Sequence, residues 1–250
     1  DVLYDIEAKG TIDVQKIYKV FSQKGLDLEG LIKADVSFNG RQSDATNGNY
    51  DKLNNKGILY LKNIQTTSAF LPKPFLIKEG LFEFNQDKMN FTNFNASYGS
   101  SDFVMNGYFE NVVNFSLSDA EVLKGNFHLN SNYINIDEFM SESATDIAEN
   151  TNSKVSGVII IPQNYDLRFN ANTKKVKFDQ LNIEDLIGSV AIKHGKIALQ
   201  RTSFELIGTK VSMDALYFNE GDSKAHFDYK IQASDFDIKR AYNEISLFRE

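Results

Sequence analysis

The stretch GNFHLNSNYINIDEFM, residues 125–140, shows the pattern on which the predicted fold rests. In its first half, apolar and polar residues alternate from Phe127 to Ser131, which is typical of a β-strand. In its second half, Asn135 precedes apolar residues at helical spacing that end at Phe139-Met140, which is typical of a helix N-cap. The stretch therefore predicts a strand followed by a short capped helix.

The capped pattern occurs twice more in the chain. Near the start it reads Ile12-Asp13-Val14 and then Ile17-Tyr18, and near the end Phe236-Asp237-Ile238 and then Ala241-Tyr242. The copies start at positions 12, 134 and 236, so the steps are 134 − 12 = 122 and 236 − 134 = 102 residues. This self-similarity predicts a β-rich unit used repeatedly. We expect short helices at residues 13–24, 135–143 and 237–247, with a bulge before the cap in the second and third copies.

The most regular strand pattern spans residues 28–38, where apolar residues alternate with polar and charged ones. Such alternation is typical of an antiparallel sheet with one apolar face and one face in water. Further strands are predicted at 57–64, 80–85, 88–97 and 103–109, with a bulge between Phe91 and Phe94. Pro72 and Pro74 argue against a central strand around them, and residues 41–56 predict a polar, mobile loop. A short helical turn is expected at 118–123.

These patterns predict a mainly β protein with one or more large curved antiparallel sheets. The sheets are expected to form an open groove or a flattened barrel, with a few short capping helices. Residues 1–140 are predicted to be a first β-rich region and residues 155–250 a second one with a C-terminal helix. Between them, residues 141–154 are polar and acidic, which predicts a flexible linker.

Composition excludes several classes of function. The 250 residues carry a net charge of −7 and a pI near 5.1, which disfavours nucleic acid as a partner. The chain has no cysteine, so disulfides, thiolate catalysis and zinc–thiolate sites are excluded. No apolar run approaches the roughly 18 residues of a membrane-spanning helix. Because the chain begins at Asp1 rather than methionine, we expect a fragment whose signal or anchor lies outside it.

The sequence shows no motif for catalysis, and we predict no enzyme activity, cofactor or metal site. The three histidines, His128, His194 and His226, are far apart and lack the spacing of metal ligands, so surface or turn positions are expected. Ser100 and Ser101 lack the strand and helix that flank a catalytic serine. Asp235 and Asp237 fit a turn and a cap better than a pair of catalytic carboxylates.

The chain resembles the C-terminal region of AsmA-like proteins. The resemblance rests on Tyr98-Gly99-Ser100-Ser101-Asp102, Met105-Asn106-Gly107, Leu123-Lys124-Gly125 and Ile134-Asn135-Ile136-Asp137, and on Gly195-Lys196-Ile197-Ala198-Leu199 in the second half. It implies a non-enzymatic protein in the periplasm, tethered to the inner membrane by a segment outside this chain. It also implies a part in outer-membrane assembly or in lipid transport between membranes.

The sequence is compatible with two functions. In the first, a β-groove holds phospholipid or other acyl chains, lined by Ile32, Val36, Phe38, Phe103, Met105 and Phe109. In the second, the chain is a structural or interaction domain that binds another envelope protein and has no lipid role. The 20 phenylalanines and 11 tyrosines fit either a groove or an ordinary packed core.

Overall fold

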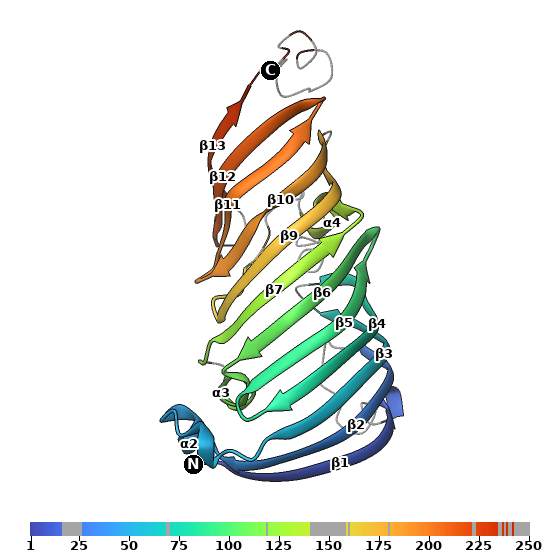
Figure 1. Ribbon diagram of the computed structural model, residues 1–250, viewed down its shortest axis with the longest axis vertical. Helices are drawn as coiled ribbons and strands as arrows, with labels where there is room; N and C mark the ends of the chain where they lie inside the picture. Colours follow the sequence, from blue (N-terminus) through green and yellow to red (C-terminus); the bar gives the residue numbers. More distant parts are fainter. Residues whose placement is uncertain are drawn as a thin grey trace, which may run out of the picture. The chain divides into compact units, whose positions relative to one another are not determined.

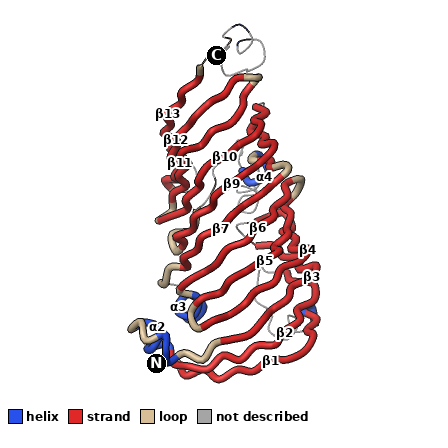
Figure 2. Tube along the Cα trace, in the orientation of Figure 1, coloured by secondary structure: helices blue, strands red, loops and turns tan. Residues whose placement is uncertain are grey.

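The computed structural model of the protein describes residues 1–16, 27–68, 71–118, 120–140, 159, 161–179, 181–221, 224–234, 237, 239 and 242 (Figure 1). The protein is mainly β, as predicted, and helices are few and short (Figure 2). The strands are β1 (Leu3–Asp13), β2 (Asp27–Arg41), β3 (Lys56–Ser68), β4 (Leu71–Asn85), β5 (Lys88–Tyr98), β6 (Ser101–Glu110), β7 (Leu123–Ser131), β8 (Ile134–Asn135), β9 (Tyr165–Phe178), β10 (Leu181–Lys193), β11 (Lys196–Leu206), β12 (Thr209–Glu220) and β13 (Lys224–Ala233).

All thirteen strands belong to one sheet. Among the described residues they hydrogen-bond in the order β1 through β7, then β9 through β13, with β7 next to β9, and β8 pairs with β9 off this path. Neighbours from β1 to β5 and from β10 to β13 are antiparallel, and β8 is parallel to β9. In the part of the chain that the structure describes, β1 and β13 are the end strands and no pairing joins them. The sheet is therefore open rather than closed on itself.

The chain divides into two compact units. Unit 1 comprises Asp1–Tyr98, Phe103–His128 and Asn164–Leu167, and unit 2 comprises Gly99–Asp102, Leu129–Gln163 and Arg168–Glu250. The linker predicted at 141–154 lies outside the described residues, as do most residues of the helices predicted at 13–24 and 237–247.

In unit 1, the predicted alternation gives the sheet one apolar and one polar face. Register places Ile6 opposite Phe38 and Ala8 opposite Val36 on the apolar face of β1 and β2. Ala34 and Val36 of that face are buried, at 4% and 7% exposure. The opposite face carries charges, including an ion pair of 2.8 Å between Lys9 Nζ and Asp35 Oδ2.

Five phenylalanines from four strands pack together on the apolar face of unit 1. They are Phe82 of β4, Phe91 and Phe94 of β5, Phe109 of β6 and Phe127 of β7. Phe91 is at the centre, with its ring centroid 5.3 to 5.7 Å from the rings of the other four. We call this group the phenylalanine cluster. Ring pairs at these distances add to the hydrophobic stabilisation from burial.

Glycines beside the phenylalanine cluster leave room for its rings. A Cβ atom at Gly80 would lie 3.1 Å from the Phe82 ring and 3.2 Å from the Phe94 ring. A Cβ atom at Gly107 would lie 2.6 Å from the Phe127 ring, which is closer than carbon atoms can approach. An aromatic ring lying over a strand glycine covers backbone that the glycine leaves bare. The glycines of these strands thus have a packing role.

The bulge predicted between Phe91 and Phe94 is confirmed. Glu79 and Leu81 of β4 pair with Asn95 and Thr92 of β5, so two residues of β5 lie opposite the single residue Gly80. The extra residue turns both Phe91 and Phe94 to the apolar face, where they are 3% and 8% exposed.

Pro72 and Pro74 lie inside β4, but in a part of the strand that is not central, as the prolines predicted. The pairing of β4 with β5 starts only at Phe75, opposite Tyr98. At the two prolines β4 therefore has β3 as its only paired neighbour among the described strands. The missing N–H groups of proline are tolerated in such a locally unpaired segment.

The prediction of a loop at residues 41–56 is wrong. The segment contains helix α2 (Gln42–Thr46) and the 3₁₀-helix η1 (Tyr50–Lys52). Ala45 and Leu53 are buried at 1% and 4% exposure, which the composition of the segment as a whole concealed. Asn55 is buried too, and its Nδ2 donates to Tyr4 Oη at 3.0 Å. The helical turn expected at 118–123 is instead helix α3 (Val112–Leu117).

In unit 2, the second copy of the repeat forms a short helix, as predicted. The prediction of a bulge before this helix is wrong, because β7 ends there instead. The chain leaves β7 after Ser131, forms β8 beside β9, and then forms helix α4 (Asp137–Met140). Asn135 Oδ1 accepts the N–H of Asp137 at 3.2 Å, so Asn135 satisfies a backbone donor at the helix start.

Polar groups from residues 99–102 hold this redirected segment. Asp102 Oδ1 accepts the N–H groups of Asn132 and Tyr133 at 3.0 and 2.8 Å. Ser101 Oγ accepts the N–H of Asn135 at 2.9 Å, and Ser101 is 1% exposed. The Glu138 carboxylate accepts the N–H of Ser100. We call these contacts the Asp102 clamp. They join the motif at residues 98–102 to the motif at residues 134–137.

The clamp makes the carboxylate of Asp102 a better acid. Burial acts to raise its pKa, but hydrogen bonds from the N–H groups of Asn132 and Tyr133 and from the Asn132 and Ser131 side chains outweigh burial and hold the pKa below its usual value. The folded state therefore favours the ionised form. The stabilisation is present above the unfolded-state pKa and is lost as the pH falls through the lower folded-state pKa.

We expect Phe91→Ala to lower the free energy of unfolding by about 3–5 kcal/mol, because it removes the ring at the centre of the phenylalanine cluster. Val104→Ala is the control, since Val104 is 39% exposed on the opposite face of β6. It should change stability by no more than about 0.5 kcal/mol. Equilibrium denaturation measures both, and equal losses would contradict the cluster's central role.

We expect Asp102→Asn to destabilise the protein at neutral pH by about 1 kcal/mol, allowing for solvent screening of this partly exposed group. The difference from the wild type should shrink as the pH falls below about 4 and through the lowered pKa of Asp102, because protonation makes the wild-type side chain neutral as well. Urea titrations at several pH values measure it. The control Glu184→Gln, at an exposed residue of β10, should change stability by no more than about 0.5 kcal/mol at neutral pH. A pH-independent loss in Asp102→Asn would contradict the clamp.

Candidate functional site

The six residues predicted to line a groove lie on one face of the sheet of unit 1. Three come from β2 (Ile32, Val36 and Phe38) and three from β6 (Phe103, Met105 and Phe109). The Phe38 ring meets Phe84 of β4 at 4.9 Å, and the Phe109 ring meets Phe91 of β5 at 5.5 Å. Phe82 pairs with Phe91, and Phe84 lies two residues along β4 from Phe82, so all these rings share a face.

The six residues form two groups rather than one compact site. Strands β3, β4 and β5 separate β2 from β6, which is four strand spacings or roughly 19 Å. Apolar residues that we did not single out fill the space between the groups: Leu59, Leu61, Phe75, Ile77, Phe82, Phe84, Met89 and Phe91. Four of them, Leu59, Leu61, Phe82 and Phe84, lie in the strands predicted at 57–64 and 80–85. The apolar face of unit 1 is thus continuous across these strands.

Burial separates the six residues by role. Val36 is buried at 7% exposure, and Phe109 is half-buried with its ring 5.0 Å from Phe127 and 5.5 Å from Phe91. These two side chains belong to the core. Ile32, Phe38, Phe103 and Met105 are half-buried, and Phe103 stacks on Phe75 at 6.2 Å. Part of the apolar face therefore remains accessible to a ligand.

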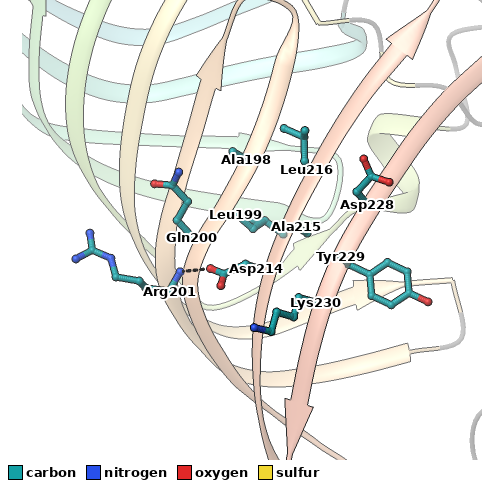
Figure 3. Close-up of a pocket in the computed structure, with 10 residues that line it drawn as sticks. All are labelled: Ala198, Leu199, Gln200, Arg201, Asp214, Ala215, Leu216, Asp228, Tyr229 and Lys230. Atoms are coloured by element: carbon teal, nitrogen blue, oxygen red, sulfur yellow. Dashed lines mark hydrogen bonds between the residues drawn. The ribbon is translucent and has the colours of Figure 1, made fainter.

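Unit 2 has an open hollow on β11, β12 and β13, with a volume of about 720 Å³ (Figure 3). The hollow lies at an irregularity in β11, where the register with β12 shifts between Leu199 and Thr202. The N–H of Arg201 donates to Asp214 Oδ1 at 2.8 Å, while the Arg201 guanidinium extends away from the other lining side chains (Figure 3). The lining residues are Ala198, Leu199, Gln200, Arg201, Asp214, Ala215, Leu216, Asp228, Tyr229 and Lys230.

The charges around this hollow balance. Arg201 and Lys230 are cationic, and Asp214 and Asp228 are anionic. A wall with two charges of each sign attracts neither anions nor cations strongly. The hollow therefore offers no distinct chemistry for a charged ligand.

Asp87 is the buried carboxylate with a perturbed pKa, a property that can mark a catalytic acid. It is 8% exposed in the turn between β4 and β5, and burial raises its pKa. Its Oδ1 accepts the N–H of Val113 at 2.9 Å and its carbonyl oxygen accepts the N–H of Val112 at 3.3 Å. Both donors are in the first turn of α3. Asp87 thus caps this helix, which explains its burial without catalysis.

The histidines lie where the sequence predicts them. His128 and His226 are exposed on strands, and His194 is exposed in the turn between β10 and β11. The His226 ring stacks on Phe218 at 4.7 Å. Within the described residues, no three histidine, aspartate or glutamate side chains are arranged to hold a metal ion.

Comparison with protein-family models, with curated proteins and with solved structures finds no match. The resemblance to AsmA-like proteins therefore stays a prediction that rests on the motifs themselves. Across the described ranges, no helix has the length and apolar character needed to span a membrane.

We expect Asp87→Ala to lower the free energy of unfolding by about 0.5–2 kcal/mol, because the N–H of Val113 loses its acceptor. Asp87→Asn is the matched control, since it keeps an acceptor oxygen and removes the buried charge. Asp87→Asn should be at least as stable as the wild type. The difference should be largest above the raised pKa of Asp87, because the buried wild-type carboxylate is then ionised and the wild type has lost stability. Thermal melts across pH test this, and equal destabilisation by both variants would contradict the capping role.

Proposed function

We propose that the protein binds acyl chains of lipids on the apolar face of unit 1. The observation that carries the proposal is the continuous apolar face that includes half-buried Ile32, Phe38 and Met105. Apolar surface left accessible on a soluble domain is typical of a ligand or partner site. A row of such side chains, without a cluster of charges among them, suits a hydrocarbon chain better than a polar metabolite.

The setting of this activity follows from the resemblance to AsmA-like proteins. On that basis the protein acts in the periplasm, tethered to the inner membrane by a segment beyond this chain. There it takes part in outer-membrane assembly or in lipid transport between membranes, with phospholipid as ligand and without catalysis or nucleic acid. The Asp102 clamp connects two of the motifs on which that resemblance rests.

A second candidate is an envelope domain that binds protein and has no lipid role. The observation that favours it is the exposed aromatic row on β13, where Phe227 and Tyr229 are 51% and 60% exposed. Lipid mass spectrometry on protein purified from membranes separates the two candidates. Phospholipid in stoichiometric amount supports the first, whereas a stoichiometric protein partner without lipid supports the second.

We expect Met105→Asp to weaken binding of a fluorescent phospholipid by roughly tenfold or more, since a carboxylate on the apolar face opposes an acyl chain. The fold should survive, because a half-buried charge at this position can reach water. Val104→Asp is the control on the same strand, with its side chain on the opposite face. It should leave binding unchanged.

Phe109→Asp should behave differently from Met105→Asp. It places a carboxylate among Phe91 and Phe127 and should cost several kcal/mol of stability. A thermal melt of each variant is run beside the binding assay. If Met105→Asp melts like the wild type and binds lipid equally well, the apolar face is not the lipid site.

A further inference from the structure

Strand β13 is a long edge strand with an unusually open side. All ten of its residues, Lys224–Ala233, are exposed. One side pairs with β12 in an unbroken register from Val211–Ala233 to Glu220–Lys224. No strand in the described part of the chain pairs with its other side.

This edge lacks most of the features by which proteins prevent strand addition. Edge strands are usually short, or they carry a proline or a bulge. β13 has none of these among its ten residues. Its residues alternate between an apolar row (Ala225, Phe227, Tyr229, Ile231 and Ala233) and a polar row (Lys224, His226, Asp228, Lys230 and Gln232). Such an edge is a template for a further strand.

Strand β1, at the other end of the sheet order, has the matching pattern. It pairs with β2 on one side, and no described strand pairs with the other. Its apolar row is Tyr4, Ile6, Ala8, Gly10 and Ile12, and its polar row includes Asp5, Glu7, Lys9, Thr11 and Asp13. Most of its residues are exposed.

We infer that β13 of one molecule pairs antiparallel with β1 of a second copy of the chain. One register aligns both rows and brings three pairs of opposite charge together. These pairs are Lys224 with Asp13, Asp228 with Lys9 and Lys230 with Glu7. In the apolar row, Ile231 then lies opposite Ile6, Tyr229 opposite Ala8, and Phe227 opposite Gly10. A Cβ atom at Gly10 would meet nothing within 4 Å, so an aromatic ring can lie over it.

Neighbouring registers are disfavoured by charge. A shift of two residues one way places Asp228 opposite Glu7, and a shift the other way places Lys230 opposite Lys9. Like charges directly opposite each other destabilise a strand pair. A shift of one residue puts apolar side chains on the polar face. If β13 instead paired antiparallel with β13 of a second copy, Asp228 of each copy would lie opposite Lys230 of the other. That register gives two pairs of opposite charge instead of three. The exposed ion pairs set register and orientation more than affinity.

The contact joins different surfaces of the two copies, so it is heterologous and can repeat from copy to copy. Each added copy continues the apolar row of β13 onto the apolar row of β1. The inference does not depend on whether the apolar face binds lipid.

Cross-linking between single-cysteine variants tests the register, because the natural chain has no cysteine. Thr11 and His226 are directly opposite in the inferred register. An oxidised mixture of Thr11→Cys and His226→Cys should give disulfide-linked dimer. A mixture of Thr11→Cys and Gln232→Cys should give about tenfold less, because its thiols are six residues or roughly 20 Å apart along the strand.

Two further mixtures separate the alternatives. His226→Cys with Gln232→Cys reports self-pairing of β13, and Thr11→Cys with Asp5→Cys reports self-pairing of β1. If either of these mixtures cross-links more than Thr11→Cys with His226→Cys, the inferred partner strand is wrong. If none of the mixtures cross-links above the level of the separate variants, the inferred contact does not exist.

A charge exchange supplies the second measurement. Lys230→Glu should reduce the association measured by sedimentation velocity, since it places a second carboxylate opposite Glu7, and adding Glu7→Lys should restore it. Lys56→Glu is the matched control, with the same change of charge on the interior strand β3. Association should also weaken as salt rises. Failure of the double variant to regain association, while it folds like the wild type, would overturn the inferred register.

Discussion

The burial of one apolar face of a single sheet is the constraint on which the rest of this structure depends. Phe91 at the centre of the phenylalanine cluster meets rings from β4, β5, β6 and β7, so one residue links four strands. The bulge in β5 and the glycines Gly80 and Gly107 make this packing possible. Without the bulge, Phe91 and Phe94 would lie on opposite faces.

A second, polar constraint governs the point where the chain leaves β7. The Asp102 clamp satisfies backbone N–H groups that would otherwise lose their partners when the strand ends. The freed segment can then form β8 and α4 beside β9. Hydrophobic packing alone supplies no reason for the chain to change direction there, so the clamp explains why the repeat ends in a short helix.

The accessible apolar surface follows from the same two-faced sheet. Residues that a closed core would bury completely, such as Ile32 and Met105, stay half-buried on the apolar face. The same alternation, carried to the exposed end strand β13, leaves an apolar row beside a charged row at an open edge. Lipid binding and strand addition would therefore use different parts of one continuous pattern.

The sequence by itself determined the strand-rich fold, the polar and apolar faces, and the bulge in β5, because side-chain alternation has a period that local composition reveals directly. It placed the six candidate residues on one face, and it placed the histidines at the surface. It did not reveal that β4 tolerates Pro72 and Pro74, since this depends on where β5 ends. Nor did it show that Asp102 would redirect the chain after Ser131, or that Ala45 and Leu53 would be buried in a polar segment. Only the tertiary structure decided these points, because each depends on contacts between residues far apart in the chain.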